Sequence, residues 1–565
     1  MKQWMVLILL IAGISGYAQN SGKKYYIRIS QLNAEVEMRL QVVGVDPELH
    51  DFLPEGLAVV EETKMAEMDK AGIPYEIVRE YRGGSLDSEY HTYNELWPWL
   101  DSISAAHPGF TQLDTLGYGQ FSGLPIPILK ISDNPGVEED EPAISFDGVH
   151  HAREPLGQET CLLIIEHLLN NYSRDEQVQF WIDHIEFYFI PCLNPDGYKY
   201  ITDENLEYPY WRKNQRDNNE NGVFDPGMDG VDLNRNYNSF WDGGDPTMSS
   251  WVYRGPEPFS EAETQLKRDH ILEQKPVLSL TYHTYGEITV YPKTLGFFYS
   301  PDRFLLAEIA TEVGSRIEKI DGGTYGPASC NCSVGQSPCW SYRVAGTFEI
   351  LVEEATVFIP PGPEMLSVAE NNLNGALYIP ERVFGPGVCG HVTCASTNNP
   401  IAATYKVMEI YDTLITPRTA GWQYGRYHRL LQPGNYTFEF SMDGYETQTI
   451  ENVLVGEDTL TVLDVQMMPF VGGSELQLAE NGMQVWIHPN PVHDVTNLTY
   501  SLAEAGFTEA GIYDITGRQI AILVSGYLDK GEHGITWNAT DTPPGVYVLS
   551  LRSNGKLITE KILVR

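Results

Sequence analysis

Residues 143–154 read AISFDGVHHARE, and this stretch decides the fold expected for the largest part of the chain. A short apolar strand at 143–146 ends in a polar segment, and an apolar helical pattern follows at 158–170. Further apolar strands, at 185–190 and 277–282, alternate with helical patterns in the same way. This alternation predicts an α/β domain over residues 88–383, with helices covering both faces of one sheet.

Polar residues follow the C-terminal ends of these strands, where ligands bind in open α/β sheets. His151 and Glu154 are three residues apart, so one turn of chain can bring both side chains to one ion, and His283 offers a third ligand. Two imidazoles and a carboxylate, with one open position for water, form a catalytic zinc site. Taken singly, the His-x-x-Glu spacing is common by chance, and a strand-end histidine is more often a buried residue bonded to backbone.

Other segments carry groups suited to binding an anion. Asn234 and Arg235 lie in GVDLNRNY at 230–237, and Arg212 lies in WRK at 211–213. Asparagine and arginine together can hold a carboxylate through charge-assisted hydrogen bonds, although an arginine can equally pair with a surface acid. The apolar strand TFEILVE at 347–353 carries two carboxylates, which are costly in such a strand unless they are paired or functional.

In their order along the chain, these segments resemble the zinc metallocarboxypeptidase family, the carboxypeptidase A/B-like exopeptidases. The matching motifs are HxxE at 151–154, NPDGY at 194–198, WRK at 211–213, DxNRN at 232–236 and HxY at 283–285, followed by the glutamate strand. The resemblance implies a central mixed sheet flanked by helices on both faces. It also implies a zinc-dependent enzyme that removes single C-terminal residues from peptides and proteins.

The resemblance implies one zinc ion in the catalytic domain, bound by His151, Glu154 and His283. Asp232 matches the carboxylate that orients a ligand histidine.

The remaining matched residues are implied to act on the substrate. Arg212 matches the arginine that stabilises the developing oxyanion, and Asn234 with Arg235 matches the pair that binds the terminal carboxylate. Arg153 and Tyr285 match contacts to the substrate further from its C-terminus.

Three glutamates compete for the role of general base: Glu349, Glu353 and Glu354. The family's SxDWxY segment reads SPCWSY at 337–342, and a gapless continuation from it reaches Glu353. The basic-residue-trimming branch has an FExxxE strand whose second glutamate is catalytic, which again matches Glu353. Strand alternation puts Glu349 and Glu353 on the same face, so periodicity does not choose between them. We expect Glu353 to be the base.

Tyr325, in TYGPAS at 324–329, is the best match to the tyrosine that closes over the substrate. The usual aspartate before the family's tryptophan is Cys339 here, and the neighbouring position, which sets side-chain preference, is Pro338. The preferred C-terminal residue is therefore not predicted.

The N-terminal region has the features of an exported precursor. Residues 1–18 combine a basic start, a compact apolar run and a small-residue cleavage site, which predicts a secretory signal peptide. The apolar run is too short to span a bilayer, and we expect no transmembrane segment in the mature chain. Residues 23–82 follow as a small α/β unit, which we interpret as a pro-segment; an ordinary accessory domain is the alternative.

Two all-β sandwich domains are expected after residue 385, separated by a linker at 470–479. Residues 388–469 resemble the transthyretin-like regulatory domain of carboxypeptidases. Residues 483–565 resemble the sorting domain of type IX secretion, through segments such as HPNP at 488–491 and PGVY at 544–547. That resemblance implies contact with an outer-membrane secretion machinery and a secreted or cell-surface location; a plain adhesion module is the alternative.

Composition limits the partners. The 565 residues contain 37 Lys+Arg and 77 Asp+Glu, a formal net charge of −40, which argues against nucleic acid as a partner. Export permits disulfides, and one from Cys339 to the Cys330-x-Cys332 pair is expected, with metal binding as the alternative. The DNNENG segment at 217–222, beginning with Asp217, resembles the first half of a calcium loop or is an Asn-rich surface turn.

These observations favour a secreted zinc metallocarboxypeptidase that uses zinc-activated water and a glutamate base. Two alternatives stay open. The first is a zinc amidase or carboxypeptidase that acts on cell-wall peptides, and the second is a surface-binding protein with an inactive peptidase-like domain.

Overall fold

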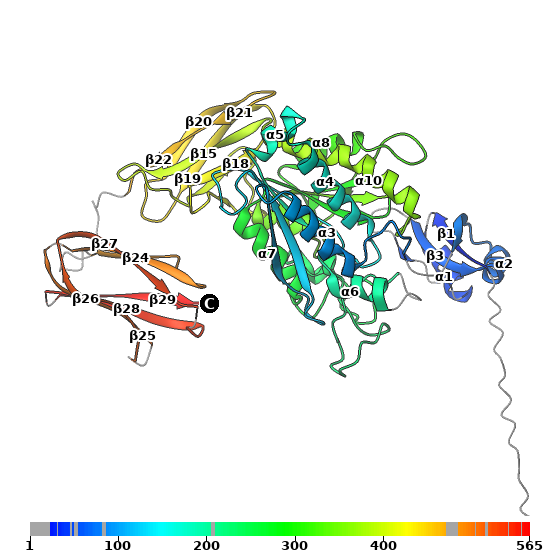
Figure 1. The fold of residues 1–565 in the computed structure, drawn as a ribbon, viewed down its shortest axis with the longest axis horizontal. Coiled ribbons are helices and arrows are strands. Elements are labelled where there is room, and N and C mark those ends of the chain that lie inside the picture. Colours follow the sequence, from blue (N-terminus) through cyan, green and yellow to red (C-terminus); the bar gives the residue numbers. More distant parts are fainter. Residues whose placement is uncertain are drawn as a thin grey trace, which may run out of the picture. The chain divides into compact units, whose positions relative to one another are not determined.

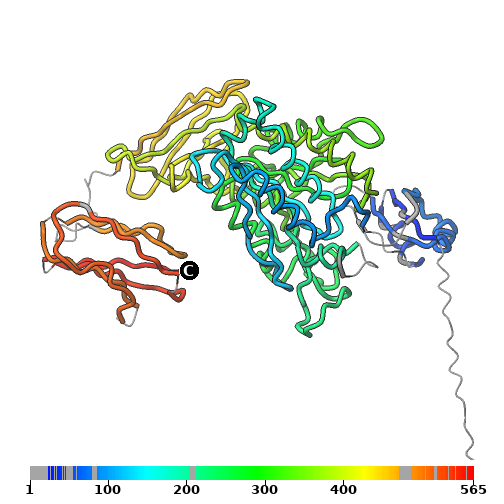
Figure 2. The backbone as a smooth tube through the Cα atoms, viewed as in Figure 1, coloured from blue at the N-terminus to red at the C-terminus, as the bar shows by residue number. Residues whose placement is uncertain are grey.

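The computed structural model describes residues 23–30, 32–43, 45, 48–49, 55–81, 86–204, 210–469, 484–502, 504–514, 518–540, 542–554 and 556–565. The predicted signal peptide and linker lie outside these ranges. The chain divides into two compact units, residues 1–469 and 470–565 (Figure 2).

An eight-stranded mixed sheet forms the centre of the first unit, in the order β13-β10-β14-β9-β7-β8-β6-β5 (Figure 1). Its strands are β5 (Thr111–Tyr118), β6 (Pro125–Ile131), β7 (Ala143–Asp147), β8 (Glu186–Ile190), β9 (Leu278–Thr284), β10 (Ile288–Pro292), β13 (Gly326–Cys330) and β14 (Phe348–Glu354). The central strands β14, β9, β7 and β8 run parallel to one another, and every residue in them is buried. The predicted mixed α/β core is therefore confirmed.

Helices cover both faces of this sheet. Thr160 of α4 (Leu156–Asn171) donates a hydrogen bond to Glu354 of β14, whereas Lys267 of α7 (Ala262–Gln274) pairs with Glu349 of the same strand. Because Glu349 and Glu354 are an odd number of residues apart, their side chains project to opposite faces of β14. The other helices are α3 (Tyr93–Ala106), α5 (Glu176–Ile182), α6 (Pro195–Lys199), α8 (Arg303–Ser315), α9 (Ser337–Trp340), α10 (Gly362–Ala376) and α11 (Tyr378–Val383).

A small α/β domain precedes the domain built on the eight-stranded sheet. Its strands β1 (Lys24–Ser30), β2 (Glu48–Leu49), β3 (Glu55–Glu61) and β4 (Glu76–Tyr81) form a sheet in the order β2-β3-β1-β4, with helices α1 (Ala34–Val43) and α2 (Glu62–Ala71). Helix α2 ends before Gly72, whose φ of 62° is the left-handed conformation that commonly ends a helix.

The small domain packs against the domain of the eight-stranded sheet beyond the end of β14. The Arg28 guanidinium donates to the backbone carbonyl of Thr356 at 3.0 Å. Leu57 joins a buried apolar cluster that includes Tyr285 and Phe358. The contact therefore lies beside Tyr285, one of the predicted substrate-binding residues.

Residues 387–467 are all-β and share one core. The strands form two four-stranded sheets, one built on β15 (Gly387–Cys394) and the other on β19 (Gly434–Ser441). The other strands are β16 (Thr404–Val407), β17 (Arg418–Thr419), β18 (Arg426–Leu430), β20 (Gln448–Val455), β21 (Leu460–Val462) and β22 (Val465–Met467). Val392 of one sheet and Phe438 of the other belong to the same buried cluster.

The second unit is also all-β. Strands β23 (Gln484–His488), β24 (Val495–Leu502) and β27 (Gly531–Asn538) form one sheet. Strands β25 (Gly506–Asp514), β26 (Gln519–Leu528), β28 (Gly545–Ser553) and β29 (Lys556–Val564) form the other. Leu498, Ile512 and Leu549 meet in one buried cluster, so residues from both sheets share a core.

None of the described helices is long and apolar enough to cross a bilayer.

The β domain at 387–467 is joined to the domain of the eight-stranded sheet by a buried ion pair. Arg429 donates to both carboxylate oxygens of Asp302, at 2.6 and 2.8 Å, and the side chains are only 4% and 3% exposed. Tyr342, in the segment after α9, donates to the same carboxylate at 2.9 Å.

We expect Arg429→Ala to lower the free energy of unfolding by about 3–5 kcal/mol, because it leaves the Asp302 charge buried without its cation. Urea denaturation followed by tryptophan fluorescence measures the loss. The matched control is Lys406→Ala, whose partner Glu439 lies 3.2 Å away and is 27% exposed, and which should cost about 0–1 kcal/mol. Equal losses of unfolding free energy in the two variants would contradict a special stabilising role for the buried Arg429–Asp302 pair.

Candidate metal centre and active site

Three predicted metal ligands converge at the C-terminal edge of the sheet. His151 and Glu154 lie between β7 and α4, and His283 lies near the end of β9. Glu154 Oε2 is 2.8 Å from His151 Nδ1 and 2.9 Å from His283 Nδ1, and the two Nδ1 atoms are 3.1 Å apart. All three side chains are buried.

This arrangement fits a cation. The two Nδ1 atoms and the carboxylate oxygen all face one another. Only one proton can lie between any two of these atoms, so hydrogen bonds cannot satisfy all of their lone pairs. A metal ion accepts lone pairs from all three at once, and His₂Glu is a donor set that catalytic zinc uses. Burial alone favours the neutral acid, but the neighbouring His151 and His283 outweigh it and hold the pKa of Glu154 well below its usual range.

Asp232 orients His151 from behind. Its Oδ1 lies 3.1 Å from His151 Nε2, so the proton on Nε2 is donated to the carboxylate and Nδ1 keeps its lone pair for a metal. Arg212 donates to Asp232 Oδ2 at 2.9 Å, and its Nη1 is 3.7 Å from Glu154 Oε1. The predicted Arg212 therefore lies beside the ligand cluster, with its charge balanced by buried acids.

Asn234 and Arg235 follow Asp232 in a short 3₁₀ turn, Leu233–Arg235. Asn234 is fully buried, and its backbone N–H donates to Asp232 Oδ1 at 2.9 Å. Its side-chain Oδ1 accepts from the Ser337 N–H at 2.8 Å, and among the described residues nothing accepts a hydrogen bond from its Nδ2. A buried amide donor without an acceptor is costly, which suits a site that receives an anionic ligand.

The three competing glutamates of β14 have different surroundings. Glu349 is fully buried, accepts from the hydroxyls of Ser337 and Ser341 at 2.6 and 2.9 Å, and lies 3.3 Å from Lys267 Nζ. Glu354 projects to the opposite face, where it accepts from Thr160 at 2.6 Å.

Glu353 lies in register with His283 on the neighbouring parallel strand. Residues in register project to the same face of a sheet, so the Glu353 side chain lies on the His283 side.

Two more predicted residues lie near the small domain's contact. The Arg153 guanidinium is 3.9 Å from the ring centroid of Phe358, and the Tyr285 ring is 4.9 Å from the same centroid. Leu57 of the small domain belongs to the same buried apolar cluster as Tyr285 and Phe358. The small domain therefore lies close to Tyr285 and to the phenylalanine ring that Arg153 contacts.

Tyr325 is not brought to this site. It is 3% exposed, and its hydroxyl accepts from the Ala355 N–H at 3.3 Å and lies 3.4 Å from the Asn372 amide of α10. It belongs to the main apolar core. The role of Tyr325 as the residue that closes over the substrate stays a prediction.

Sequence reasoning missed a network of buried charged residues in the sheet, next to the predicted metal ligands. Lys267 Nζ lies 2.7 Å from Asp147 and 3.3 Å from Glu349, and Asp147 also accepts from Thr281 at 2.7 Å. The ring of His150 stacks on that of His283, with centroids 5.2 Å apart. The one available signal was Asp147 at the end of an apolar strand, since such an acid needs a buried cation.

The remaining metal predictions have different outcomes. Cys332 and Cys339 form a disulfide, which agrees with the predicted loop disulfide. Asp217 accepts from the N–H groups of Asn221 and Gly222 at 3.2 and 2.7 Å. Of the described side chains, those of this loop do not appear in any cluster of three or more potential metal ligands, so the structure does not support the calcium prediction.

Known proteins share this sequence and fold. The model of the zinc carboxypeptidase family matches residues 96–375. Carboxypeptidase B of Astacus astacus is 30% identical over 302 residues, which cover 51% of this chain and 95% of that protein. The chain belongs to the zinc carboxypeptidase family. Carboxypeptidase A2 of Rattus norvegicus is 29% identical over 317 residues, covering 54% of this chain and 72% of that protein.

The solved structures of zinc carboxypeptidases share the fold. Thrombin activatable fibrinolysis inhibitor superposes with a TM-score of 0.54 at 20% identity, covering 64% of this chain and 98% of that one. Carboxypeptidase A of Helicoverpa armigera gives 0.53 at 18% identity, with coverages of 64% and 98%.

Residues 486–565 match the secretion system C-terminal sorting domain. Neither family match covers residues 388–469, so the transthyretin-like resemblance stays a prediction.

Asp232→Asn should weaken zinc binding by about 10–100-fold, because the amide no longer balances the charge of Arg212 or fixes the His151 tautomer as firmly. Competition with a chromophoric chelator measures the dissociation constant directly. Asp245→Asn, which removes a carboxylate whose hydrogen-bond donors, Thr247 and Ser250, lie in its own local turn, is the control and should leave zinc affinity unchanged. Unchanged affinity in Asp232→Asn would contradict the orienting role.

Proposed function

We propose that this zinc carboxypeptidase removes single residues from the C-termini of peptides and proteins. One observation carries the proposal: the buried Asn234 amide presents a donor without an acceptor among the described residues, two residues from the Asp232 that holds His151. Arg235 is adjacent in the same turn. An amide donor and a guanidinium together suit a carboxylate, and on a peptide backbone only the chain end offers one.

His151, Glu154 and His283 would hold the zinc ion. When bound, zinc supplies a Lewis acid that polarises a carbonyl and lowers the pKa of water. Arg212, already beside the cluster, would stabilise the negative charge that develops on the scissile carbonyl oxygen. Arg153 and Tyr285 would contact the substrate on the N-terminal side of the scissile bond.

Glu353 is the glutamate we assign as general base. It would accept the proton of the attacking water and donate it to the leaving amine. The surroundings of its competitors support this choice, since Glu349 is engaged with Lys267 and two serines, and Glu354 projects to the other face. Burial also raises the pKa of Glu354 well above its usual range, which disfavours the ionised base.

Mass spectrometry of a peptide pool, incubated with zinc-loaded enzyme that lacks residues 1–82, tests the function. We expect stepwise loss of single C-terminal residues that a chelator abolishes. Glu353→Gln should keep zinc and lose about 10²–10⁴-fold in turnover. Glu349→Gln is the matched control, because it keeps hydrogen-bonding capacity on the same strand face and should retain most of the turnover. The reverse pattern would make Glu349 the base.

If zinc-loaded enzyme trims no peptide in the pool but releases residues from cell-wall peptides, the substrate is the cell wall and the proposal for general peptides fails. Zinc-loaded enzyme that acts on neither would favour a binding protein with an inactive domain.

We also propose that residues 23–82 keep the enzyme latent and that residues 483–565 direct its export by type IX secretion. Support for latency comes from the contacts of Arg28 and Leu57 beside Tyr285 and Phe358. The match of residues 486–565 to a secretion sorting domain supports export and, with it, a location outside the cell or on its surface.

Removal of residues 23–82 should raise kcat/KM on a peptide substrate by at least about tenfold, because it removes the contacts of Arg28 and Leu57 beside Tyr285, a residue proposed to bind the substrate. Kinetics before and after limited proteolysis measure the gain. Arg28→Ala in the uncleaved chain should give part of the same gain, whereas Arg39→Ala, whose contacts stay within the small domain, should give none. Equal activity of cleaved and uncleaved enzyme would contradict latency.

A further inference from the structure

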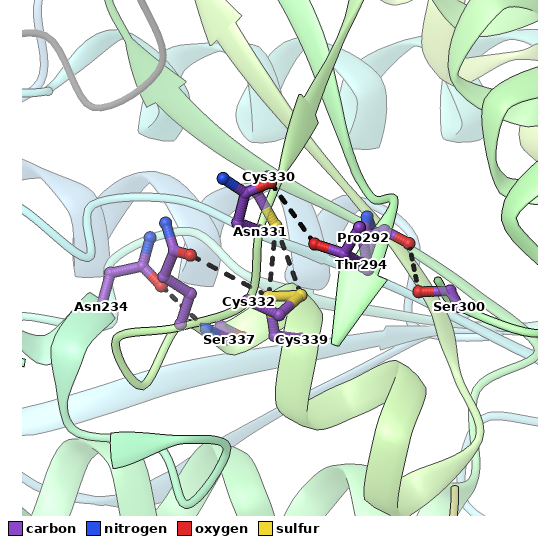
Figure 3. The surroundings of a disulfide bond; sticks show 10 residues. Asn234, Pro292, Thr294, Ser300, Cys330, Asn331, Cys332, Ser337 and Cys339 are labelled. Atoms are coloured by element: carbon purple, nitrogen blue, oxygen red, sulfur yellow. Dashed lines mark hydrogen bonds between the residues drawn. A yellow bond between two sulfur atoms is a disulfide. The ribbon is translucent and has the colours of Figure 1, made fainter. Parts of the chain in front are cut away.

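Three cysteine sulfurs lie together beside the Asn234 turn (Figure 3). Cys332 and Cys339 are joined by a disulfide, and the Sγ of Cys330 lies 3.2 Å from that of Cys339 and 3.4 Å from that of Cys332. All three are buried, and Cys330 is a free thiol at the end of β13. Thiol–disulfide exchange needs a thiolate within reach of a disulfide sulfur, and the contact between Cys330 and Cys339 provides it.

We propose that Cys330, Cys332 and Cys339 form an exchange site, in which the disulfide moves between Cys332–Cys339 and Cys330–Cys339 and thereby changes how firmly the Asn234–Arg235 turn is held. The consequence for the turn rests on the proposed function, because it concerns the binding of a substrate carboxylate. The exchange itself does not depend on that function.

The exchange is balanced within the chain. The Cys330 thiol loses its proton, and the thiolate attacks Cys339 Sγ. A bond forms between Cys330 and Cys339, the Cys332–Cys339 bond breaks, and Cys332 leaves as a thiolate that takes up a proton. One disulfide and one thiol are present before and after, so neither an oxidant nor a reductant is required. Attack at Cys332 instead would link two cysteines separated by a single residue, a much tighter ring.

Backbone geometry favours access to the second pairing. Cys332 has a φ of 45°, a left-handed conformation that costs free energy for a residue with a Cβ. In the Cys332–Cys339 pairing the disulfide holds Cys332 at this position. In the Cys330–Cys339 pairing Cys332 is released, and its backbone can relax. The strain therefore offsets part of the cost of leaving the observed pairing.

The loop between Cys332 and Cys339 holds the carboxylate-binding turn. The Ser337 N–H donates to Asn234 Oδ1 at 2.8 Å, which fixes the orientation of that amide (Figure 3). Just after Arg235, the Tyr237 N–H donates to the Gly335 carbonyl at 3.0 Å, and the Gly335 N–H donates to the Ser239 carbonyl at 3.1 Å. Release of Cys332 frees one end of this loop, so these bonds weaken and Asn234 is less firmly oriented.

The buried surroundings of Cys330 slow the exchange enough for each disulfide pairing to be trapped by acid quenching. Burial raises the pKa of the Cys330 thiol to about 12, and the charge of Arg235 opposes that rise. Because the thiolate is the attacking species, exchange should quicken as the pH rises and stop on acid quenching. The two pairings can therefore be counted after they have equilibrated.

The test uses the full zinc-loaded chain, incubated at pH 7 and pH 9, quenched with acid, alkylated and digested without reduction. Tandem mass spectrometry then identifies whether Cys330 or Cys332 carries the alkyl group. We expect both pairings, with equilibrium reached sooner at pH 9. The Cys332→Ser variant should form the Cys330–Cys339 disulfide, and Cys330→Ser should keep Cys332–Cys339. Cys394→Ser, outside the cluster, is the control and should match the wild-type pairing.

Finding only Cys332–Cys339 in the wild type at both pH values would overturn the exchange, as would a free Cys339 thiol in folded Cys332→Ser. If Cys332→Ser fails to fold, the disulfide map of the wild type still decides whether the exchange occurs.

Kinetics test the effect of the exchange on substrate binding. Cys332→Ser should raise KM for peptide acids by about tenfold with kcat little changed, which is the effect of losing one charge-assisted hydrogen bond. Cys330→Ser, locked in the Cys332–Cys339 pairing, should have a KM no higher than that of the wild type, and equal KM in both variants would separate the exchange from substrate binding. Absence of any trimming would reject the proposed function while leaving the disulfide map valid.

Discussion

Two imidazoles and a carboxylate that meet within 3.1 Å in a buried site impose the constraint on which the rest of this catalytic domain depends. His151 and Glu154 lie in the segment after β7, and His283 lies near the end of the neighbouring parallel strand β9, so all three meet at one edge of the sheet. Bringing such groups together without a cation leaves lone pairs facing one another in a medium of low dielectric constant. A bound metal ion turns this cost into binding energy, so the sheet and the metal stabilise each other.

Charge balance extends outward from the ligands in two directions. On one side, Asp232 lies between His151 and Arg212, so the proton position on the histidine and the placement of the arginine are set together. On the other side, Lys267 neutralises Asp147 and Glu349 deep in the sheet. Glu349 is occupied in this way, which supports the proposal that Glu353, in register with His283, is the general base.

Local motifs predicted the three clustered side chains, because HxxE follows β7, HxY begins at the end of β9, and each motif carries its chemistry within a few residues. The predicted strands 143–146, 185–190 and 277–282 became the buried centre of the sheet. The surroundings of Tyr325 could not be predicted, because a motif match cannot tell which way a side chain faces, and its hydroxyl lies 3.4 Å from the Asn372 amide of α10. Lys267 was missed because its partner Glu349 lies 82 residues away, where neither pattern nor spacing connects them. The pairing of Cys339 with Cys332 rather than Cys330 also required the structure, since both spacings permit a disulfide.

The central claim is that a terminal carboxylate, recognised at Asn234 and Arg235, places the substrate on the metal centre. The most direct measurement compares kcat/KM for one peptide with a free C-terminal carboxylate and the same peptide with a C-terminal amide. The account predicts a loss of at least about 100-fold for the amide, because buried donors are left without an anionic partner. Equal cleavage of the two peptides would contradict it, because the site would then not read the chain end.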